Sequence, residues 1–189
     1  MPSFLDFLQP RRTFLTSSGL LLSGAAVALL SGNDALAADQ PAVGTAAADA
    51  SILNTALGAE LEAIAAYQLA GDSGLLDASV KSLALTFQGH HQEHAQLLAK
   101  TIAKLGGKPA AVKGKYDFPK DKLKSQADVL RFAASLEQGA VSAYLGAIPQ
   151  FASRDLAKAA ASILGDEAMH WAVLRQALGE APVPSAFVT

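Results

Sequence analysis

The sequence predicts an all-α fold, a four-helix bundle in which two antiparallel helix pairs are joined by a long crossover. Four stretches carry apolar residues at the three- and four-residue spacing of a helix face. A two-helix unit occurs twice, with an offset of 76 to 77 residues between equivalent positions. About 20 residues without helical periodicity separate the two units, which suits a connection that returns along the length of a bundle.

The composition favours one soluble domain with a sizeable core. Of the 189 residues, 51% are hydrophobic and 17% are charged, a composition that is rich in core residues but not membrane-like throughout. The net charge is −2 and no basic stripe is present, so we expect no nucleic-acid partner. Cysteine is absent, which excludes disulfides and thiolate ligands. Any metal must therefore be held by histidine and carboxylate side chains.

Residues 1–37 are predicted to be a twin-arginine signal peptide. Arg11 and Arg12 precede Phe14, an apolar run follows from residue 20 to 30, and a small-residue cleavage site stands at 35–37. We therefore expect export to the periplasm, with no stable membrane insertion after cleavage. A retained N-terminal anchor is the alternative. Because this export route carries folded proteins, often with a cofactor already loaded, it favours a bound metal.

The first helix should begin near Asp49 or Ser51, because either residue can cap it. It should end at about Ala70, before two glycines. Residues 38–49, rich in alanine, are expected to form a disordered lead-in, and residues 50–182 to form the bundle.

The second helix is predicted from Asp77 to Leu105, where two glycines and a proline end it. The crossover covers residues 106–125, with Tyr116 and Phe118 available to attach it to the bundle.

The third helix should begin at Ser125 and end before Pro149, and the fourth should run from about Ser153 to Leu178. Residues 183–189 form a C-terminal tail. We expect the apolar residues after position 180 to lie against the bundle.

Polar residues interrupt the apolar seam of every predicted helix. At about 1.5 Å of rise per residue, their distances from the two hairpin turns place all of them within roughly two helical turns along the bundle axis. Glu167 and His170 lie one turn apart on one helix face, and His91 and His94 repeat that spacing. The candidate metal ligands are Glu60, His91, His94, Glu137, Glu167 and His170.

Buried carboxylates demand an explanation, because an unpaired one costs several kcal/mol. A divalent cation would supply the missing positive charge, and imidazole with carboxylate suits iron, manganese or zinc. The alternative is a metal-free network in which protonated histidines face the glutamates. Tyr67 and Tyr144 are either simple core residues or donors that orient a carboxylate across the bundle, and His90 could reach the site or the surface.

The mature chain resembles the exported bacterial ferritin-like domain family over about residues 50–185. The shared motifs are Leu-Gly-Gly-Lys-Pro after the second helix, Tyr-Asp-Phe-Pro at 116–119, Ala-Tyr-Leu-Gly-Ala at 143–147 and Ile-Leu-Gly-Asp-Glu-Ala-Met-His at 163–170. One Glu on each of two helices and Glu-x-x-His on each of the others is the ligand pattern of ferritin-like di-metal carboxylate proteins. The Glu-x6-Tyr spacing is similar to that of rubrerythrin.

The resemblance implies that Glu60, Glu137, Glu167, His94 and His170 occupy the family's ligand positions. His91 departs from the pattern, because it stands where the family has a glutamate that commonly bridges two metals. The expected cofactor is thus iron or manganese, as one or two ions, or none. Without cysteine, the chain also lacks a rubredoxin-type electron relay.

The resemblance implies a metal-binding protein that oxidises ferrous iron or removes peroxide; no individual catalytic residue is predicted. The alternative is a non-catalytic stress or structural protein with a vestigial or empty site. A zinc hydrolase is less well supported, because no general base stands beside an open site. A homo-oligomer is compatible with the resemblance, whereas an iron-storage shell has weak support.

Overall fold

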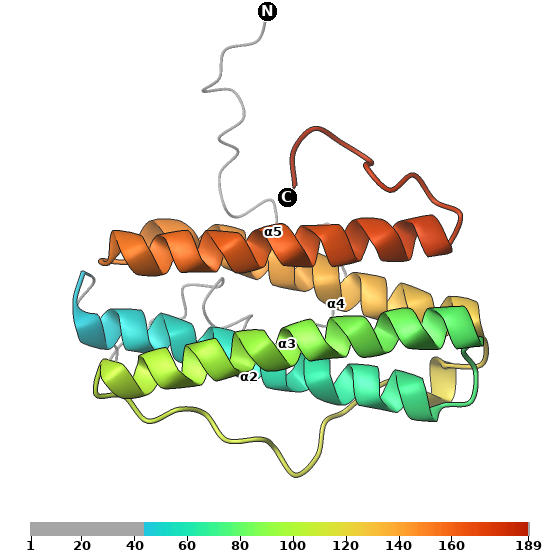
Figure 1. Ribbon diagram of the computed structural model, residues 1–189, viewed down its shortest axis with the longest axis horizontal. Coiled ribbons are helices and arrows are strands. Elements are labelled where there is room, and N and C mark those ends of the chain that lie inside the picture. The colour runs from blue at the N-terminus through green and yellow to red at the C-terminus, as the bar shows by residue number, and fades with distance from the viewer. Residues whose placement is uncertain (1–43, 189) are drawn as a thin grey trace, which may run out of the picture.

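The computed structural model describes residues 44–188, so the predicted signal peptide and residues 38–43 of the predicted lead-in lie outside it. Within this range the chain forms four long helices, α2 (Ala46–Asp72), α3 (Ala78–Lys104), α4 (Gln126–Ala147) and α5 (Arg154–Ala177). Two short 3₁₀ turns, η4 (Lys120–Lys122) and η5 (Ile148–Gln150), complete it. The predicted all-α four-helix bundle is confirmed (Figure 1).

Short polar side chains cap the helix starts, since the first amides of a helix have no partner within it. Asp77, Ser125 and Ser153 accept hydrogen bonds from backbone amides three residues ahead, as the sequence pattern predicts. Gly106 and Gly179 follow the ends of α3 and α5 with φ of 81° and 74°, a conformation that favours glycine. The predicted bounds of these three helices agree with the structure to within one or two residues.

The first helix begins earlier than predicted. Thr45 caps it by accepting a hydrogen bond from Ala48, so residues 46–49 of the expected disordered lead-in are helical. The prediction of Asp49 or Ser51 as the cap is wrong because the Asp49 side chain has other partners. It is 2% exposed and accepts hydrogen bonds from the amides of Ala152 and Ser153, at 2.8 and 3.0 Å. Asp49 thereby joins the start of α2 to the turn between α4 and α5.

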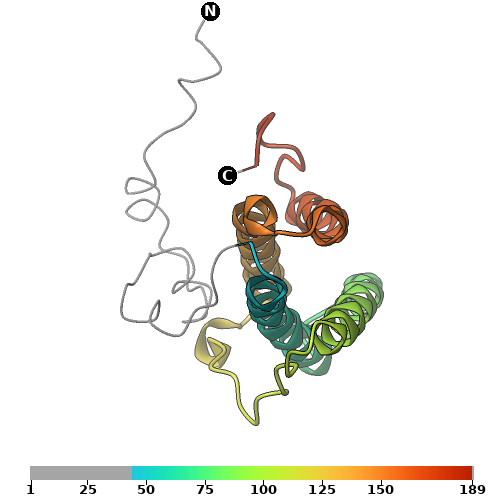
Figure 2. The ribbon, with the colours of Figure 1, turned by 90° about the vertical axis from the view of Figure 1, so that its left-hand side faces the viewer.

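The bundle consists of two antiparallel hairpins, α2 with α3 and α4 with α5, and α4 lies over α2 (Figures 1 and 2). The crossover from α3 to α4 runs along the length of the bundle, as predicted (Figure 1). Asn54 holds its beginning through hydrogen bonds to the backbone of Lys108 and Ala110. Phe118 holds its far part by packing against Phe132 of α4.

The apolar core has two parts, one toward each end of the bundle. The antiparallel order of the helices explains why each part draws on all four of them. At one end, residues early in α2 and α5 pack against residues late in α3 and α4. At the other end, residues late in α2 and α5 pack against residues early in α3 and α4. The polar seam residues fall between the two parts. The first part comprises Leu53, Leu57, Ala95, Leu98, Ile102, Tyr144, Ala160 and Ile163. The second comprises Tyr67, Ala84, Phe87, Leu130, Ala133, Ala134 and Leu174.

The expectation that the apolar residues of the C-terminal tail lie against the bundle is wrong for two of them. Val183 and Phe187 are 76% and 67% exposed, so these apolar residues do not pack on the bundle. Figure 2 shows this segment leading away from α5. Most of the surface of each of these two residues lies in solvent, so apolar composition alone misled the prediction. Over residues 44–188, none of the helices combines the length and apolar content that crossing a bilayer requires.

Candidate metal centre

The six predicted ligands come together at mid-bundle, one or two from each long helix. Five of them are at most 3% exposed, and the side chain of His94 is 14% exposed. Glu60 comes from α2, His91 and His94 from α3, Glu137 from α4, and Glu167 and His170 from α5. The sequence prediction that these side chains converge is confirmed. Their role as metal ligands remains a prediction.

Two groups of four side chains can each hold a metal ion, and they share two members. Glu60 and His94 form the first half-site, and Glu137 and His170 form the second. His91 and Glu167 belong to both. Within each group, one ligand atom per residue lies within 4.8 Å of all the others. The arrangement therefore has the connectivity of a dinuclear centre with two shared residues.

Glu167 stands between the two half-sites with one oxygen toward each. Its Oε1 lies 3.1 Å from Nδ1 of His94, and its Oε2 lies 3.3 Å from Nδ1 of His170. This residue is 0% exposed. Glu167 is thus placed to serve two cations at once.

His91 spans the half-sites on the other side. Its Nδ1 lies 2.8 Å from Glu60 Oε2, and its Nε2 lies 3.3 Å from Glu137 Oε1. Burial alone would lower the pKa of His91, but the hydrogen bonds to Glu137 and Glu60 outweigh it and raise the pKa to about 11. In the metal-free protein, His91 is therefore an imidazolium that donates to one carboxylate of each half-site.

The two tyrosines are paired crosswise with the glutamates. Tyr144 of α4 donates its hydroxyl to Glu60 of α2 at 2.6 Å, and Tyr67 of α2 donates to Glu137 of α4. Burial, followed by the nearby carboxylate, raises the pKa of each tyrosine well above its usual value, so both remain donors. Of the two roles open at the sequence level, orientation of a carboxylate across the bundle is the one that the geometry supports.

Asp166 is the functional candidate that sequence reasoning missed. Its Oδ2 lies 3.4 Å from Nε2 of His94 and 3.2 Å from Nε2 of His170, on the outer side of both rings. Metal-binding histidines commonly donate the second ring N–H to a carboxylate, which fixes the ring. The spacing of four residues between Asp166 and His170 was the available signal. His90, predicted to reach the site or the surface, lies beside Asp166.

The donor set fits a metal. Four buried polar atoms have no hydrogen-bond partner among the described residues: Nδ1 of His94, Nδ1 of His170 and both carboxylate oxygens of Glu167. All four belong to the half-sites defined above. Buried polar atoms without partners are costly, and a cation between them would satisfy them together. Imidazole and carboxylate at such a site suit a divalent first-row transition metal.

The family model for the ferritin-like domain matches residues 48–180, which is most of the chain. The chain belongs to the ferritin-like domain family. Among solved structures, this ferritin-like chain is similar to a conserved hypothetical protein of Mycobacterium tuberculosis, with 22% identity and a TM-score of 0.64. The match covers 74% of this chain and 96% of the other, and at this identity it shows the fold alone. None of the curated proteins matches.

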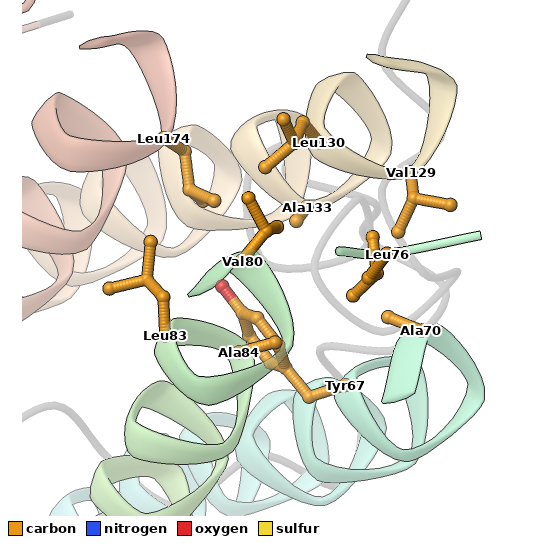
Figure 3. A pocket seen from close by; sticks show the side chains of 10 residues that line it. All are labelled: Tyr67, Ala70, Leu76, Val80, Leu83, Ala84, Val129, Leu130, Ala133 and Leu174. Carbon is orange, nitrogen blue, oxygen red and sulfur yellow. The ribbon is translucent and has the colours of Figure 1, made fainter. Parts of the chain in front are cut away.

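A small apolar cavity lies beside Tyr67 in the ferritin-like chain (Figure 3). That cavity has a volume of about 10 Å³ and an apolar lining that includes Leu76, Leu130 and Leu174. Tyr67 also lines it, while its hydroxyl bonds to Glu137. The space suits at most one water-sized molecule.

The metal-free ferritin-like chain is expected to lose stability as the pH rises from about 6 to about 9. Burial lowers the pKa of His94 and His170, but Glu167 and Glu60 on one side and Glu137 and Glu167 on the other raise both values to about 9. A raised pKa in the folded state stabilises fully below the unfolded pKa of about 6.5, and this contribution is lost as pH passes the folded value. Urea midpoints of metal-stripped protein across this range measure it; a flat or rising midpoint would contradict the ion pairs.

Proposed function

We propose that this chain is an exported ferritin-like metalloprotein that holds two ions of iron or manganese and oxidises ferrous iron or removes peroxide. Glu60 and His94 would hold one ion, and Glu137 and His170 would hold the other. Glu167 would contact both ions, and His91 would face both half-sites. The twin-arginine pattern at Arg11 and Arg12 supports export to the periplasm.

The observation that carries this proposal is the pair of overlapping four-residue groups, in which four buried atoms have no hydrogen-bond partner among the described residues. A purely structural network would be expected to satisfy these atoms with hydrogen bonds. Instead, Nδ1 of His94 and Nδ1 of His170 lie 3.1 and 3.3 Å from the Glu167 oxygens without a hydrogen bond in either pair, which supports a cation between them. The outer nitrogens of the same two histidines face Asp166. This division between inner and outer ring atoms is the usual orientation of metal-binding histidine.

The protein residues hold the site and control access to it. Tyr67 and Tyr144 fix Glu137 and Glu60 from across the bundle, and Phe87 stacks on His170 with ring centroids 4.0 Å apart. The two apolar core parts exclude water from both ends. Iron or manganese held here would exchange one electron per ion, so that two ions together could supply the two electrons that reduction of peroxide to water takes up.

A non-catalytic, metal-free protein is the second candidate, and one observation favours it. His91, as an imidazolium, already balances part of the charge of Glu60 and Glu137 without any metal. Such a protein would act in stress or as a structural component. The observation that counts against this second candidate is that the two oxygens of Glu167 lack a hydrogen-bond partner among the described residues.

The proposal is tested with the mature protein, purified without chelator and supplied anaerobically with about two equivalents of ferrous iron per chain. Addition of peroxide should produce ferric iron faster than in buffer alone, and two ferrous ions should be oxidised as one peroxide and two protons become two waters. The matched control is Glu93→Gln, which removes an exposed carboxylate from α3. Oxidation no faster than in buffer would reject the redox function and favour the non-catalytic candidate.

A further inference from the structure

A second group of potential metal ligands lies outside the centre described above. Nδ1 of His90 lies 3.0 Å from Oδ2 of Asp166 and 2.9 Å from Nε2 of His170. The three residues form a separate candidate group for a metal ion. His90 contributes nothing to either inner half-site, so the function proposed above leaves it without a role.

This outer group occupies the solvent side of the centre. Side-chain exposure falls from 42% at His90 to 21% at Asp166 and 14% at His94, and it is at most 3% at the inner carboxylates. On the other sides, Tyr67 covers His91 and Phe87 covers His170, both with stacked rings. Among the described residues, this gradient marks a polar route between solvent and the inner ligands.

We propose that His90 and Asp166 form an outer binding site that takes a divalent transition-metal ion from solvent and passes it to the inner centre. One imidazole nitrogen and one carboxylate oxygen are ligands of the type that such ions prefer. His90 and Asp166 alone leave most coordination positions to water, so the ion is held weakly and can move on. The transfer step, though not the outer site itself, rests on the proposed inner centre.

An ordinary positioning role for His90 makes a different prediction. If His90 only oriented His170 through their 2.9 Å contact, its loss would weaken the equilibrium affinity of the inner centre. An entry site, in contrast, changes the rate of filling and leaves the final number of inner ions unchanged. The rate at which metal fills the inner centre and the final number of bound ions therefore distinguish an entry site from a positioning role.

The experiment uses cobalt(II) as the probe, with filling of the metal-stripped protein followed by visible absorbance and the final content measured by elemental analysis. His90→Ala should fill about tenfold more slowly than the unaltered protein and reach the same inner content. His90→Asp, which supplies a carboxylate oxygen in place of the ring nitrogen, should recover most of the rate. Glu93→Gln, on the same helix, should fill like the unaltered protein. The His90 side chain is 42% exposed and belongs to neither part of the apolar core, so these variants are expected to fold.

Equal filling rates for His90→Ala and Glu93→Gln, with the inner centre filled, would overturn the outer site while leaving the proposed inner centre intact. A lowered final content with an unchanged rate would assign His90 to positioning and would also overturn it. The inner variant Glu60→Ala/Glu167→Ala separates the two proposals. It should retain about one weakly bound cobalt ion that the further change His90→Ala removes. If the unaltered protein itself binds only this ion, the outer site stands and the inner centre fails.

Discussion

The Glu60→Ala/Glu167→Ala variant is expected to purify without stoichiometric metal, whereas the unaltered protein retains about two ions of iron or manganese. Glu167 belongs to both half-sites and Glu60 to one, so their removal leaves neither group of four complete. The measurement is elemental analysis of protein exported through its own signal and purified without chelator or affinity metal. Loss of a charged inner ligand should lower affinity by at least about a hundredfold.

The control is Glu62→Ala/Glu93→Ala, which also removes two glutamates, one from α2 and one from α3, both outside the cluster. It should keep the metal. About one ion per unaltered chain would indicate a mononuclear site in which His91 replaces a second metal. If the unaltered protein and the double variant both lack metal and unfold alike, the dinuclear proposal is wrong and the cluster is a structural network.

His91→Leu is expected to destabilise the metal-free protein by about 3 to 5 kcal/mol at neutral pH, because it removes one partner of a buried ion pair and leaves charges uncompensated. His91 is 1% exposed and contacts Glu60 and Glu137 through opposite ring nitrogens. Leucine fills much of the ring volume, so the loss reports mainly on charge. Urea unfolding of the metal-stripped proteins gives the difference.

His91→Glu provides the complementary test, because it restores the carboxylate that ferritin-like di-metal proteins carry at this position. Without metal, a fourth buried carboxylate joins Glu60, Glu137 and Glu167, and the protein should be less stable than His91→Leu. With iron or manganese added, the same variant should recover most of its stability. A His91→Leu protein as stable as the unaltered one without metal would show that the His91 ion pairs contribute little.

The bundle and the six inner residues were predictable because both depend on spacing along single helices. A glutamate or histidine that interrupts a 3.6-residue seam, such as Glu137, must face the core, and antiparallel order brings the interruptions to one level. The repeat of Glu60 and Tyr67 at Glu137 and Tyr144 strengthened this inference, since two matched registers are harder to explain by chance than one.

Other features depended on contacts that spacing does not encode. Asp166 lies at the edge of the α5 seam, and its role emerges only because α3 places His90 and His94 opposite it. The start of α2 was mispredicted because the Asp49 carboxylate accepts hydrogen bonds from two backbone amides in the turn before α5, far away in the sequence, and does not cap its own helix. His91 was recognised as a departure from the family pattern, but only its position between two carboxylates shows how the chain tolerates it.

The crossed tyrosines make the two hairpins depend on each other at the centre. Each hairpin supplies the hydroxyl that the glutamate of the other hairpin needs, through Tyr67 with Glu137 and Tyr144 with Glu60. A hairpin on its own would have a glutamate without its donor and a tyrosine without its acceptor. Neither hairpin alone therefore forms either tyrosine–glutamate pair, so correct docking of the two hairpins is needed before either glutamate has its hydroxyl donor.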